Sequence, residues 1–449
     1  MKYDGLVDIA TGRNRKETNW RNKEISWAEL VKKLSVTHRT AETYSEYVAA
    51  KKSRQDEIKD IGGFVGGYLA NGKRKAANVL RRQLLTLDMD YASVGFWDDF
   101  TLLYNNAALI YSTHKHSSEH PRLRLILPLD RPVFSDEYEA IGRKLAGVLG
   151  IELFDITTFQ PERLMYWPST ASDGEYLFEY QDGPWLCADN ILGSYYNWKD
   201  SSEWPVSAKV DTLVKRSMVK QGDPLEKQGV VGAFCRAYTI TEAIDTFLAD
   251  VYEPCGVDNR YTYKEGSTSA GLMLYDDKFA YSHHGTDPAS GKLCNAFDLV
   301  RLHKFGLMDE EAKEGTPGNK LPSYTDMIEF AAKDGKVKKQ LGVERLQEAK
   351  GDFDFTADYG GEDENTEWMI ELEIDRKGRY YSTIDNIVLI LENDPVFKNN
   401  IAFDEFEQRA IFRKNVPWRK INHKTRYITD RDDHNIEHYL EKVYEITST

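Results

Sequence analysis

The sequence predicts an α+β fold for the first part of the chain, because strand-like and helix-like segments alternate there. Apolar runs at 84–87, 107–111 and 123–127 have the composition of buried strands. The segment 135–149 instead has helical spacing, with Ser135 as a plausible N-cap and a glycine directly after its last residue. Strands interleaved with helices up to about residue 190 indicate one domain of α/β or α+β type.

The other elements expected in this domain follow from local composition. The first 60 residues are polar and mostly helix-like, and a glycine-rich stretch and an Asn-Gly turn precede the first strand. Pro128 is expected to stop the third strand, because proline cannot donate to a sheet ladder. The expected amphipathic helix, glycine-rich stretch, second helix and last strand are at 27–34, 62–68, 97–104 and 164–167.

The rest of the chain divides by composition into further regions. A polar linker is expected after the first domain, followed by a mostly helical domain, a charged linker region and a small α/β piece. No internal repeat is evident. In chain order the predicted bounds of the five regions are 1–195, 196–227, 228–305, 306–366 and 367–449.

Composition narrows the class of protein. The chain has 449 residues, 41% of them hydrophobic, which suffices for several buried cores. Four cysteines in so long a chain do not make a disulfide framework and indicate a reducing compartment. No apolar run approaches the roughly 20 residues of a membrane span, and the first residues do not resemble a signal peptide. We therefore expect a protein of the cytoplasm with no membrane partner.

The charge is unevenly distributed. A net charge of −14 argues at first against nucleic acid as a ligand. However, acid is concentrated in segments such as Glu362-Asp363-Glu364, and basic clusters lie at 73–75, 81–82 and 413–426. Such runs are often only solvated faces. Net charge therefore does not decide whether the chain binds nucleic acid.

A pair of carboxylates in an apolar run is the strongest chemical signal. Asp88 and Asp90 end the first predicted strand, and alternation along a strand puts both on one face. Two adjacent carboxylates repel each other unless a positive group lies between them, and oxygen ligands suit Mg²⁺ or Mn²⁺. Asp155 adds a third carboxylate after another apolar pair. The alternative is a pair of solvated aspartates at the end of a strand.

Groups that could hold phosphate follow the second strand. Ser112 and His114 share one face of an extended segment, and both can donate hydrogen bonds to phosphate oxygens. Three carboxylates with such a pair are the minimal equipment for metal-assisted phosphoryl transfer. Further candidates for phosphate contacts are Lys115, His116, Arg122, Arg124 and Arg163, and candidates for nucleic-acid contacts are Lys73, Arg74 and Arg236.

Three motifs in this order resemble a known family. Asp88-Met89-Asp90, Ser112-Thr113-His114 and Phe154-Asp155 look like the signature motifs of archaeo-eukaryotic primases, which include the primase-polymerases. The surrounding segments 120–129 and 161–168 resemble the primases of phages and mobile elements of Gram-positive bacteria. In those proteins a virulence-associated-E-type or superfamily 3 helicase commonly follows. The resemblance to the catalytic part covers about residues 60 to 190.

The resemblance implies a fold, a reaction and partners. The first domain would have an RRM-like sheet with an N-terminal α/β module, the region 228–305 would be like a primase C-terminal domain, and 367–449 would be a connector to a helicase. Asp88, Asp90 and Asp155 would bind two Mg²⁺ or Mn²⁺ ions, and Ser112 and His114 would hold the incoming nucleotide. The substrates would be NTPs or dNTPs and a single-stranded DNA template, in the host cytoplasm.

One departure concerns the helicase. No G-x-x-x-x-G-K-[ST] motif occurs in the chain, so the phosphate-binding loop of a helicase motor is missing. Either the helicase is a separate polypeptide or the chain is a fragment of a longer primase-helicase, and the position of the connector-like piece favours the latter.

Two other functions stay open. A rolling-circle replication nuclease needs a His-hydrophobe-His metal site, which His114-Lys115-His116 imitates with the wrong central residue. A catalytically silent DNA-binding or helicase-loading module would not need the aspartates at all. Zinc is unlikely, because Cys255, His283, His284 and Cys294 lack the spacing of a zinc site.

Overall fold

The protein has two compact units in a computed structural model that describes residues 1–312, 315–352, 366–376 and 378–446. The first unit is Met1–Lys220 with Leu248–Cys294, and the second is Gln221–Phe247 with Asn295–Thr449. The acidic run Glu362-Asp363-Glu364 lies outside the described residues. Among the described helices none is long and apolar enough to cross a lipid bilayer.

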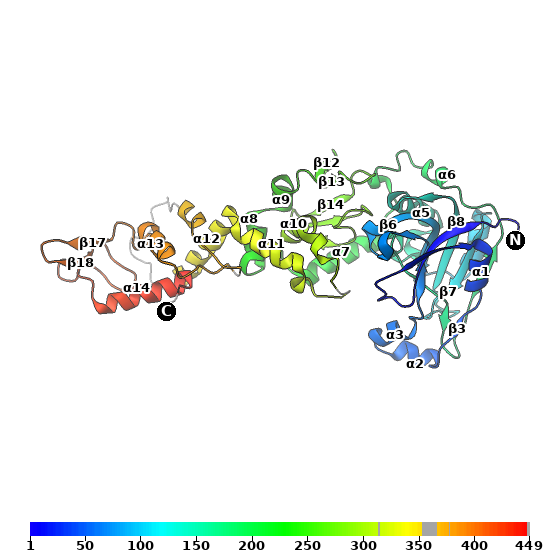
Figure 1. Cartoon of the computed structure of the whole chain (residues 1–449), viewed down its shortest axis with the longest axis horizontal. Coiled ribbons are helices and arrows are strands. Elements are labelled where there is room, and N and C mark those ends of the chain that lie inside the picture. Colours follow the sequence, from blue (N-terminus) through cyan, green and yellow to red (C-terminus); the bar gives the residue numbers. More distant parts are fainter. Residues whose placement is uncertain (313–314, 353–365, 377, 447–449) are drawn as a thin grey trace. The chain divides into compact units, whose positions relative to one another are not determined.

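A two-stranded sheet of β3 and β10 and two larger sheets form the amino-terminal part of the first unit (Figure 1). Of these two, the larger has five strands in the order β11-β7-β8-β6-β5, and the smaller has the order β2-β1-β4-β9. The strands are β1 Leu6–Gly12, β2 Arg21–Ser26, β3 His38–Arg39, β4 Gly63–Val65, β5 Gly67–Leu69, β6 Val79–Met89, β7 Ala108–Ser112, β8 Leu123–Val133, β9 Met165–Tyr166, β10 Ser169–Thr170 and β11 Phe178–Gln181. The helices are α1 Trp27–Leu34, α2 Tyr44–Ala49, α3 Lys52–Ile58, α4 Phe96–Leu103, α5 Ser135–Leu149, α6 Ala188–Leu192 and α7 Ala208–Gln221, with the 3₁₀ turn η4 at Ile156–Phe159.

The larger sheet is buried on both faces, and alternation along β6 assigns its residues to one face or the other. Leu85 and Leu87 belong to a core that includes residues of α4 and α5. Leu84 belongs to a second core that includes Trp27 and other residues of α1, β1 and β4. Asp88 and Asp90 have the parity of Leu84. They therefore point to the side of the sheet that the amino-terminal module covers.

Most predicted elements of this part are present, with one notable difference in β8. The predicted helix 135–149 is confirmed and ends at Gly150, whose φ of 99° suits glycine, although its N-cap is Phe134 rather than Ser135. The third strand was expected to stop at Pro128 but continues to Val133. The pairing between β6 and β8 shifts register between Arg82 and Leu84, opposite this proline. Such an irregularity accommodates a residue that lacks the N–H of the ladder.

The expected helical domain at 228–305 is interrupted by a sheet. Five antiparallel strands in sequential order belong to the first unit, and they are β12 Tyr252–Pro254, β13 Arg260–Tyr263, β14 Leu272–Tyr275, β15 Phe279–Ser282 and β16 Leu293–Cys294. In β14 buried Leu272 and Leu274 alternate with half-buried Met273 and Tyr275, but all four residues are hydrophobic, so the sequence itself shows no alternation there. None of the four cysteines, all of which are described, forms a disulfide.

The second unit is mainly helical, and parts of both expected linkers are ordered. Helix α7 occupies the linker predicted at 196–227, and two helices occupy the described part of the charged region predicted at 306–366. The elements of this unit are α8 Gly229–Ala237, α9 Ile240–Phe247, α10 Ala296–Phe305, α11 Pro322–Lys333, α12 Gly335–Asp352, α13 Ile384–Asn393, β17 Ile401–Asp404, β18 Arg409–Phe412 and α14 Asp430–Tyr444. Taken over both units, the mixture of helices and sheets confirms the predicted α+β class.

Candidate active site

The three predicted metal-binding carboxylates line one cavity of about 360 Å³ in the first unit. Asp88 lies near the end of β6, Asp90 follows that strand, and Asp155 is the N-cap of η4. The backbone N–H of Asp155 donates to the carbonyl oxygen of Asp88 over 2.9 Å. The loop before η4 is thereby fixed to the end of β6. This contact links carboxylates that are 65 residues or more apart in the chain.

Each of these carboxylates faces an arginine. Arg124 is the register partner of Asp88, and its Nε lies 3.5 Å from Asp88 Oδ1. Arg122, two residues earlier on the same face, lies 3.1 Å from Asp90 Oδ1. Arg163 NH2 lies 2.5 Å from Asp155 Oδ2 and 3.9 Å from Asp88 Oδ2. The three arginines predicted to contact phosphate therefore line the same cavity as the carboxylates.

Burial sets the electrostatics of these pairs. It raises the pKa of Asp90, the neighbouring Asp88 raises it further, and Arg122 opposes the rise. Burial disfavours the charge of Arg124, but Asp88 and Tyr111 beside it raise the pKa of this guanidinium above its ordinary value. Arg124 therefore stays charged. Its NH1 also donates to the carbonyl oxygen of Tyr166 over 3.3 Å.

The donor chemistry of the cavity suits a hard divalent cation, although the carboxylates are not gathered around one point. Asp88 Oδ1 and Arg124 Nε are buried and have no hydrogen-bond partner among the described residues. A carboxylate oxygen that accepts no hydrogen bond, beside two other carboxylates, is the kind of ligand that Mg²⁺ and Mn²⁺ prefer. Yet in the part of the chain that the structure describes, no three His, Cys, Asp or Glu side chains form a cluster that could hold a metal ion. The arginines occupy the space between the carboxylates instead.

His114 lines the cavity, and both its ring nitrogens are engaged. Nδ1 lies 2.9 Å from Ser169 Oγ, and Nε2 lies 2.9 Å from Glu42 Oε1. Burial lowers the pKa of His114, an effect that the hydrogen bond to Glu42 opposes. A neutral ring between a hydroxyl and a carboxylate donates from Nε2 to Glu42 and accepts at Nδ1 from Ser169.

Two other predicted phosphate ligands lie outside this cavity lining. Ser112 is buried, and its hydroxyl oxygen accepts a hydrogen bond from the backbone N–H of Leu177 over 3.0 Å. His116 Nδ1 accepts from the backbone N–H of Arg122 over 3.2 Å. Ser112 therefore fixes β11 beside β7, and the paired-histidine metal site of a rolling-circle nuclease is not assembled by His114 and His116. Lys115, between the histidines, does line the cavity.

The three predicted nucleic-acid contacts also lie elsewhere. Lys73 and Arg74 do not line the cavity, and the Arg74 guanidinium lies 5.4 Å from the ring centre of Trp20. Arg236 belongs to the second unit, where its NH2 lies 2.7 Å from Glu344 Oε2 and its NH1 2.8 Å from the carbonyl oxygen of Lys227. The Arg236 contacts join α8 to α12 and to the turn before α8. Their geometry is that of a structural arginine.

Sequence reasoning missed the contribution of the amino-terminal helices. Lys52 and Lys59 lie on and just after α3 and line the cavity opposite the sheet. Both contact Asp56, and the distance from Lys59 Nζ to Asp56 Oδ1 is 2.9 Å. No local pattern distinguishes these lysines from solvated ones, because only the tertiary structure brings them to the cavity that the carboxylates line. The other lining residues missed are Tyr47, Gln55, Thr113, Tyr166, Trp167 and Ser169.

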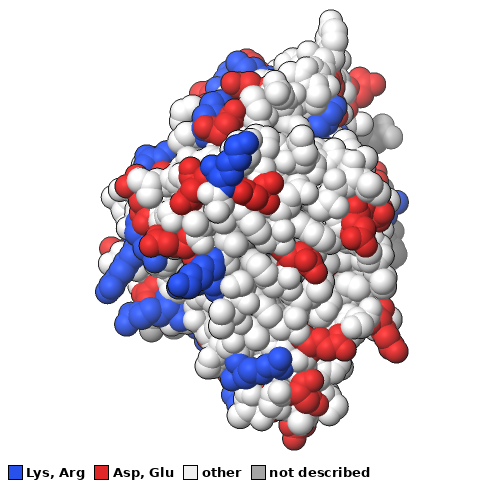
Figure 2. Space-filling model, turned by 90° about the vertical axis from the view of Figure 1, so that its right-hand side faces the viewer, with Lys and Arg blue, Asp and Glu red and all other residues white. Residues whose placement is uncertain are grey.

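Acidic and basic side chains are mixed on the face of the molecule that Figure 2 shows. Figure 2 shows basic and acidic side chains interspersed on one face, with broad uncharged areas between them. A continuous basic surface, which would bind a phosphate backbone through many contacts, is not present on that face. The cavity is different, because the cationic side chains there are concentrated beside the carboxylates.

Comparisons with known proteins give one family and one solved structure. Residues 1–207 match the model of a family described as VapE N-terminal domain. This match confirms the predicted resemblance to the virulence-associated-E type for that part of the chain. No curated protein matches. The AEP domain of the primase-polymerase of cyanophage S-2L is 14% identical, over 42% of this chain and 88% of that one, with a TM-score of 0.25. At this TM-score the likeness supports no structural or functional conclusion.

Proposed function

We propose that this chain, whose first 207 residues match the VapE N-terminal domain family, is a template-dependent primase or primase-polymerase of a phage or mobile element. The observation that carries the proposal is the cavity that holds Asp88, Asp90 and Asp155 together with Arg122, Arg124 and Arg163. Nucleotidyl transfer requires carboxylates that bind metal ions and, beside them, cationic side chains that bind phosphates. The substrates would be NTPs or dNTPs and single-stranded DNA.

The topology of the larger sheet supports an RRM-like core. The chain runs β6, α4, β7, β8 and α5, and β8 lies between β6 and β7. All three strands are antiparallel where they pair. An RRM has a four-stranded sheet that carries its ligand-binding residues, and here Asp88 on β6 and Arg124 on β8 line the cavity.

In the proposed reaction each residue has a defined task. Asp88, Asp90 and Asp155 would hold two Mg²⁺ or Mn²⁺ ions, which would lower the pKa of the 3′-hydroxyl and neutralise the leaving pyrophosphate. Arg122 and Arg163 would exchange their present carboxylate partners for the oxygens of the triphosphate. Ion pairs that are partly exposed to a cavity can be exchanged in this way at small cost, because water and ions compete for both partners.

His114, Lys115 and the lysines of α3 would bind and orient the nucleotide. His114 keeps its ring fixed through Ser169 and Glu42, so that it packs against Tyr47 with 4.2 Å between ring centres. Lys59 lies 2.9 Å from Asp56, and burial lowers the pKa of its ammonium. An incoming triphosphate would compensate the cost of burying that charge.

The experiment is nucleotide incorporation on a single-stranded template, with and without a primer, in Mg²⁺ or Mn²⁺. Labelled NTPs and dNTPs are compared for the protein and for Asp88→Asn, with exposed Asp99→Asn on α4 as the control. We expect product from the protein and from the control and none from Asp88→Asn. Product that survives Asp88→Asn would remove the carboxylates from the mechanism.

The ion pairs favour a second candidate function. If the arginines never leave the carboxylates, the domain is a catalytically silent DNA-binding or helicase-loading module. It would then bind single-stranded DNA but incorporate no nucleotide under any metal condition. Calorimetric titration with Mn²⁺ separates the two candidates, because only the polymerase requires metal binding that Asp88→Asn abolishes. A replicative helicase partner is compatible with both and is proposed from the family name alone.

A further inference from the structure

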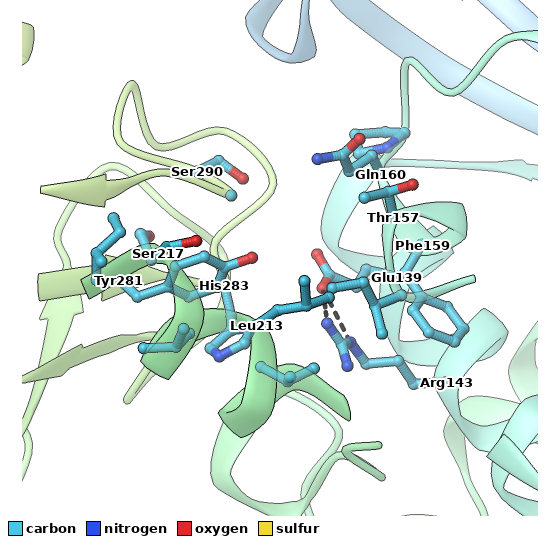
Figure 3. A pocket seen from close by; sticks show the side chains of 17 residues that line it. Glu139, Arg143, Thr157, Phe159, Gln160, Leu213, Ser217, Tyr281, His283 and Ser290 are labelled. Atoms are coloured by element: carbon cyan, nitrogen blue, oxygen red, sulfur yellow. Dashed lines mark hydrogen bonds and ion pairs between the residues drawn. The ribbon is translucent and has the colours of Figure 1, made fainter. Parts of the chain in front are cut away.

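A second cavity of about 240 Å³ lies in the first unit, beside the candidate active site (Figure 3). One wall is formed by α5 and η4, with Glu139, Arg143 and Gln160 pointing inward. The opposite wall is formed by α7 and the five-stranded sheet of β12 to β16, with Leu213 and His283. None of these residues belongs to the carboxylate cavity.

The two walls are held together by specific contacts, so the cavity is built into the fold. Both the backbone N–H and the hydroxyl of Ser267 donate to Asp136 Oδ2, over 3.1 and 2.7 Å. Asp136 is in the first turn of α5, next to the cavity wall. The backbone N–H groups of Ser201 and Ser269 add hydrogen bonds to the carbonyl oxygens of Ser269 and Lys199, over 3.1 and 2.6 Å. Pockets for small molecules are usually preformed in this way.

Above the pKa of Glu139, which burial raises to about 7, the charges of this cavity cancel. Glu139 and Arg143 are one helical turn apart on α5, and Arg143 Nε and NH2 lie 2.9 and 2.8 Å from the same oxygen, Glu139 Oε1. Arg143 NH1 donates to the carbonyl oxygen of Pro205, and its guanidinium lies 4.8 Å from the ring centre of Phe159. Arg143 is the one lysine or arginine in the lining, and burial lowers the pKa of His283, so that this ring is neutral. A phosphate group would find no available cation here.

Several polar atoms in the lining have no partner among the described residues. Glu139 Oε2, the amide of Gln160 and both ring nitrogens of His283 make no hydrogen bond, and the side chains of Gln160 and His283 are half-buried at the cavity, so that a ligand can reach their polar atoms. They face the cavity from opposite walls (Figure 3). Apolar side chains, including Leu213 and Phe159, form the surfaces between them. The cavity therefore combines hydrogen-bond donors and acceptors with apolar surfaces.

We infer that this cavity binds an uncharged heterocycle of the nucleobase class, which combines an apolar ring with hydrogen-bonding groups on its edge. A base would place its ring against Leu213 and Phe159 and its polar edge against Glu139, Gln160 and His283. The choice of a nucleobase among such heterocycles rests on the proposed function. Its source is either a free nucleoside or an unpaired base of the single-stranded template.

The second cavity is connected to the carboxylates through residues of η4. Thr157 lines the second cavity, its hydroxyl donates to Asp155 Oδ2 over 2.9 Å, and its backbone N–H donates to Asp155 Oδ1 over 3.0 Å. Thr158, the next residue of η4, accepts at Oγ1 from the backbone N–H of Asp88 over 2.6 Å. A base held here therefore lies against the turn that fixes two of the three carboxylates.

The test is calorimetric titration of the full chain with nucleosides, which carry no phosphate, in the absence of metal. Leu213→Trp fills the cavity, and Val219→Trp places the same ring on the exposed side of the same helix. We expect binding of at least one nucleoside, a loss of about tenfold or more in Leu213→Trp, and no change in Val219→Trp. Gln160→Ala, which removes only a hydrogen-bonding group, is expected to weaken binding several-fold without lowering the melting temperature.

Competition identifies the source of the base. An oligonucleotide with a single base among abasic positions displaces the nucleoside if the template is the ligand, and leaves it bound if the free nucleoside is. Either result supports the cavity as a base site. Absence of nucleoside binding, or binding that Leu213→Trp and Gln160→Ala leave unchanged, overturns it. Because Asp88→Asn should retain nucleoside binding, failure of nucleotide incorporation and failure of this inference are separate observations.

Discussion

The two cavities of the first unit both contain carboxylates and arginines, but they arrange them differently. Around Asp88, Asp90 and Asp155 each arginine comes from another strand or loop, and the charged groups are numerous. In the second cavity Glu139 and Arg143 lie on one helix and neutralise each other. Charges contributed by separate elements can change partners when a ligand enters, whereas an i, i+4 pair within one helix stays closed. The first arrangement suits ions and phosphates, and the second suits an uncharged ring.

The largest expected effect tests what the comparison says about the carboxylate cavity, namely that its charges act on metal ions and phosphates. Asp155→Asn keeps the shape of the side chain but removes the charge opposite Arg163. We expect nucleotide incorporation to fall by a factor on the order of 10³, because a metal-binding charge acts directly on the transition state. Steady-state incorporation rates measure it. Asp130→Asn, which removes a carboxylate from the far part of β8, is the control. An equal fall in the control would mean that the loss is structural.

The pH dependence of the free energy of unfolding tests what the comparison says about the second cavity, where Glu139 is paired with Arg143. Burial raises the pKa of Glu139 to about 7, Arg143 opposes the rise, and Asp136 and Glu162 add to it. Between pH 4.5 and about 7 Glu139 therefore keeps its proton in the folded chain but loses it in the unfolded chain. The stabilisation that this proton contributes to the folded state is fully present below pH 4.5 and is lost as the pH rises through 7. Relative to Glu139→Gln, the protein should lose about 3 kcal/mol at most between pH 5 and pH 8.

Denaturant midpoints of both proteins at the two pH values measure this difference. The comparison with Glu139→Gln cancels the contributions of the other titrating groups. A difference between the two proteins that does not change with pH would show that Glu139 stays ionised in its pair with Arg143.

A smaller effect distinguishes structural arginines from ligand-binding ones. Arg236→Ala removes the contacts to Glu344 and Lys227, and we expect it to destabilise the second unit by about 1–3 kcal/mol. Affinity for single-stranded DNA should not change. Lys333→Ala removes an equal charge from an exposed position of the same unit. If Arg236→Ala weakens DNA binding and Lys333→Ala does not, Arg236 is a nucleic-acid contact after all, as its sequence position first suggested.

The smallest effect concerns nucleotide affinity. Arg163→Lys keeps the charge beside Asp155 but loses the planar fork, so the KM for nucleotides should rise about tenfold with a smaller change in kcat. Arg131→Lys, on β8 and paired with Glu137 and Asp189, serves as the matched substitution. A change in kcat alone would place Arg163 in the positioning of Asp155 instead of the binding of the triphosphate.

Local patterns were sufficient for the strands and for the faces of their residues. The alternation that puts Asp88 on the face of Leu84 and Arg122 on the face of Arg124 is a property of any extended chain, so it could be predicted without the fold. The family resemblance rested on the same short segments. By contrast, five antiparallel strands at 252–294 were missed, because each is only two to four residues long and has too little alternation to stand out.

Residues beyond the strand ends could not be placed from the sequence. Ser112 and His114 have the same parity, yet Ser112 bonds to β11 while His114 reaches Glu42 and Ser169. Where β7 ends, the chain turns, and side-chain direction no longer follows from period two. The environment of each residue then depends on which remote segment packs beside it.

The sequence by itself determined the α+β class, the carboxylate and arginine faces of the main sheet and the resemblance of residues 1–207 to the VapE N-terminal domain family. The tertiary structure alone decided that α3 brings Lys52 and Lys59 to the carboxylates, and that α5 and β15 enclose a second, neutral cavity. The physical reason is the range of the interactions. Periodicity acts between neighbours in the chain, whereas a cavity is made by segments that meet only after the hydrophobic faces of the sheets and helices have packed.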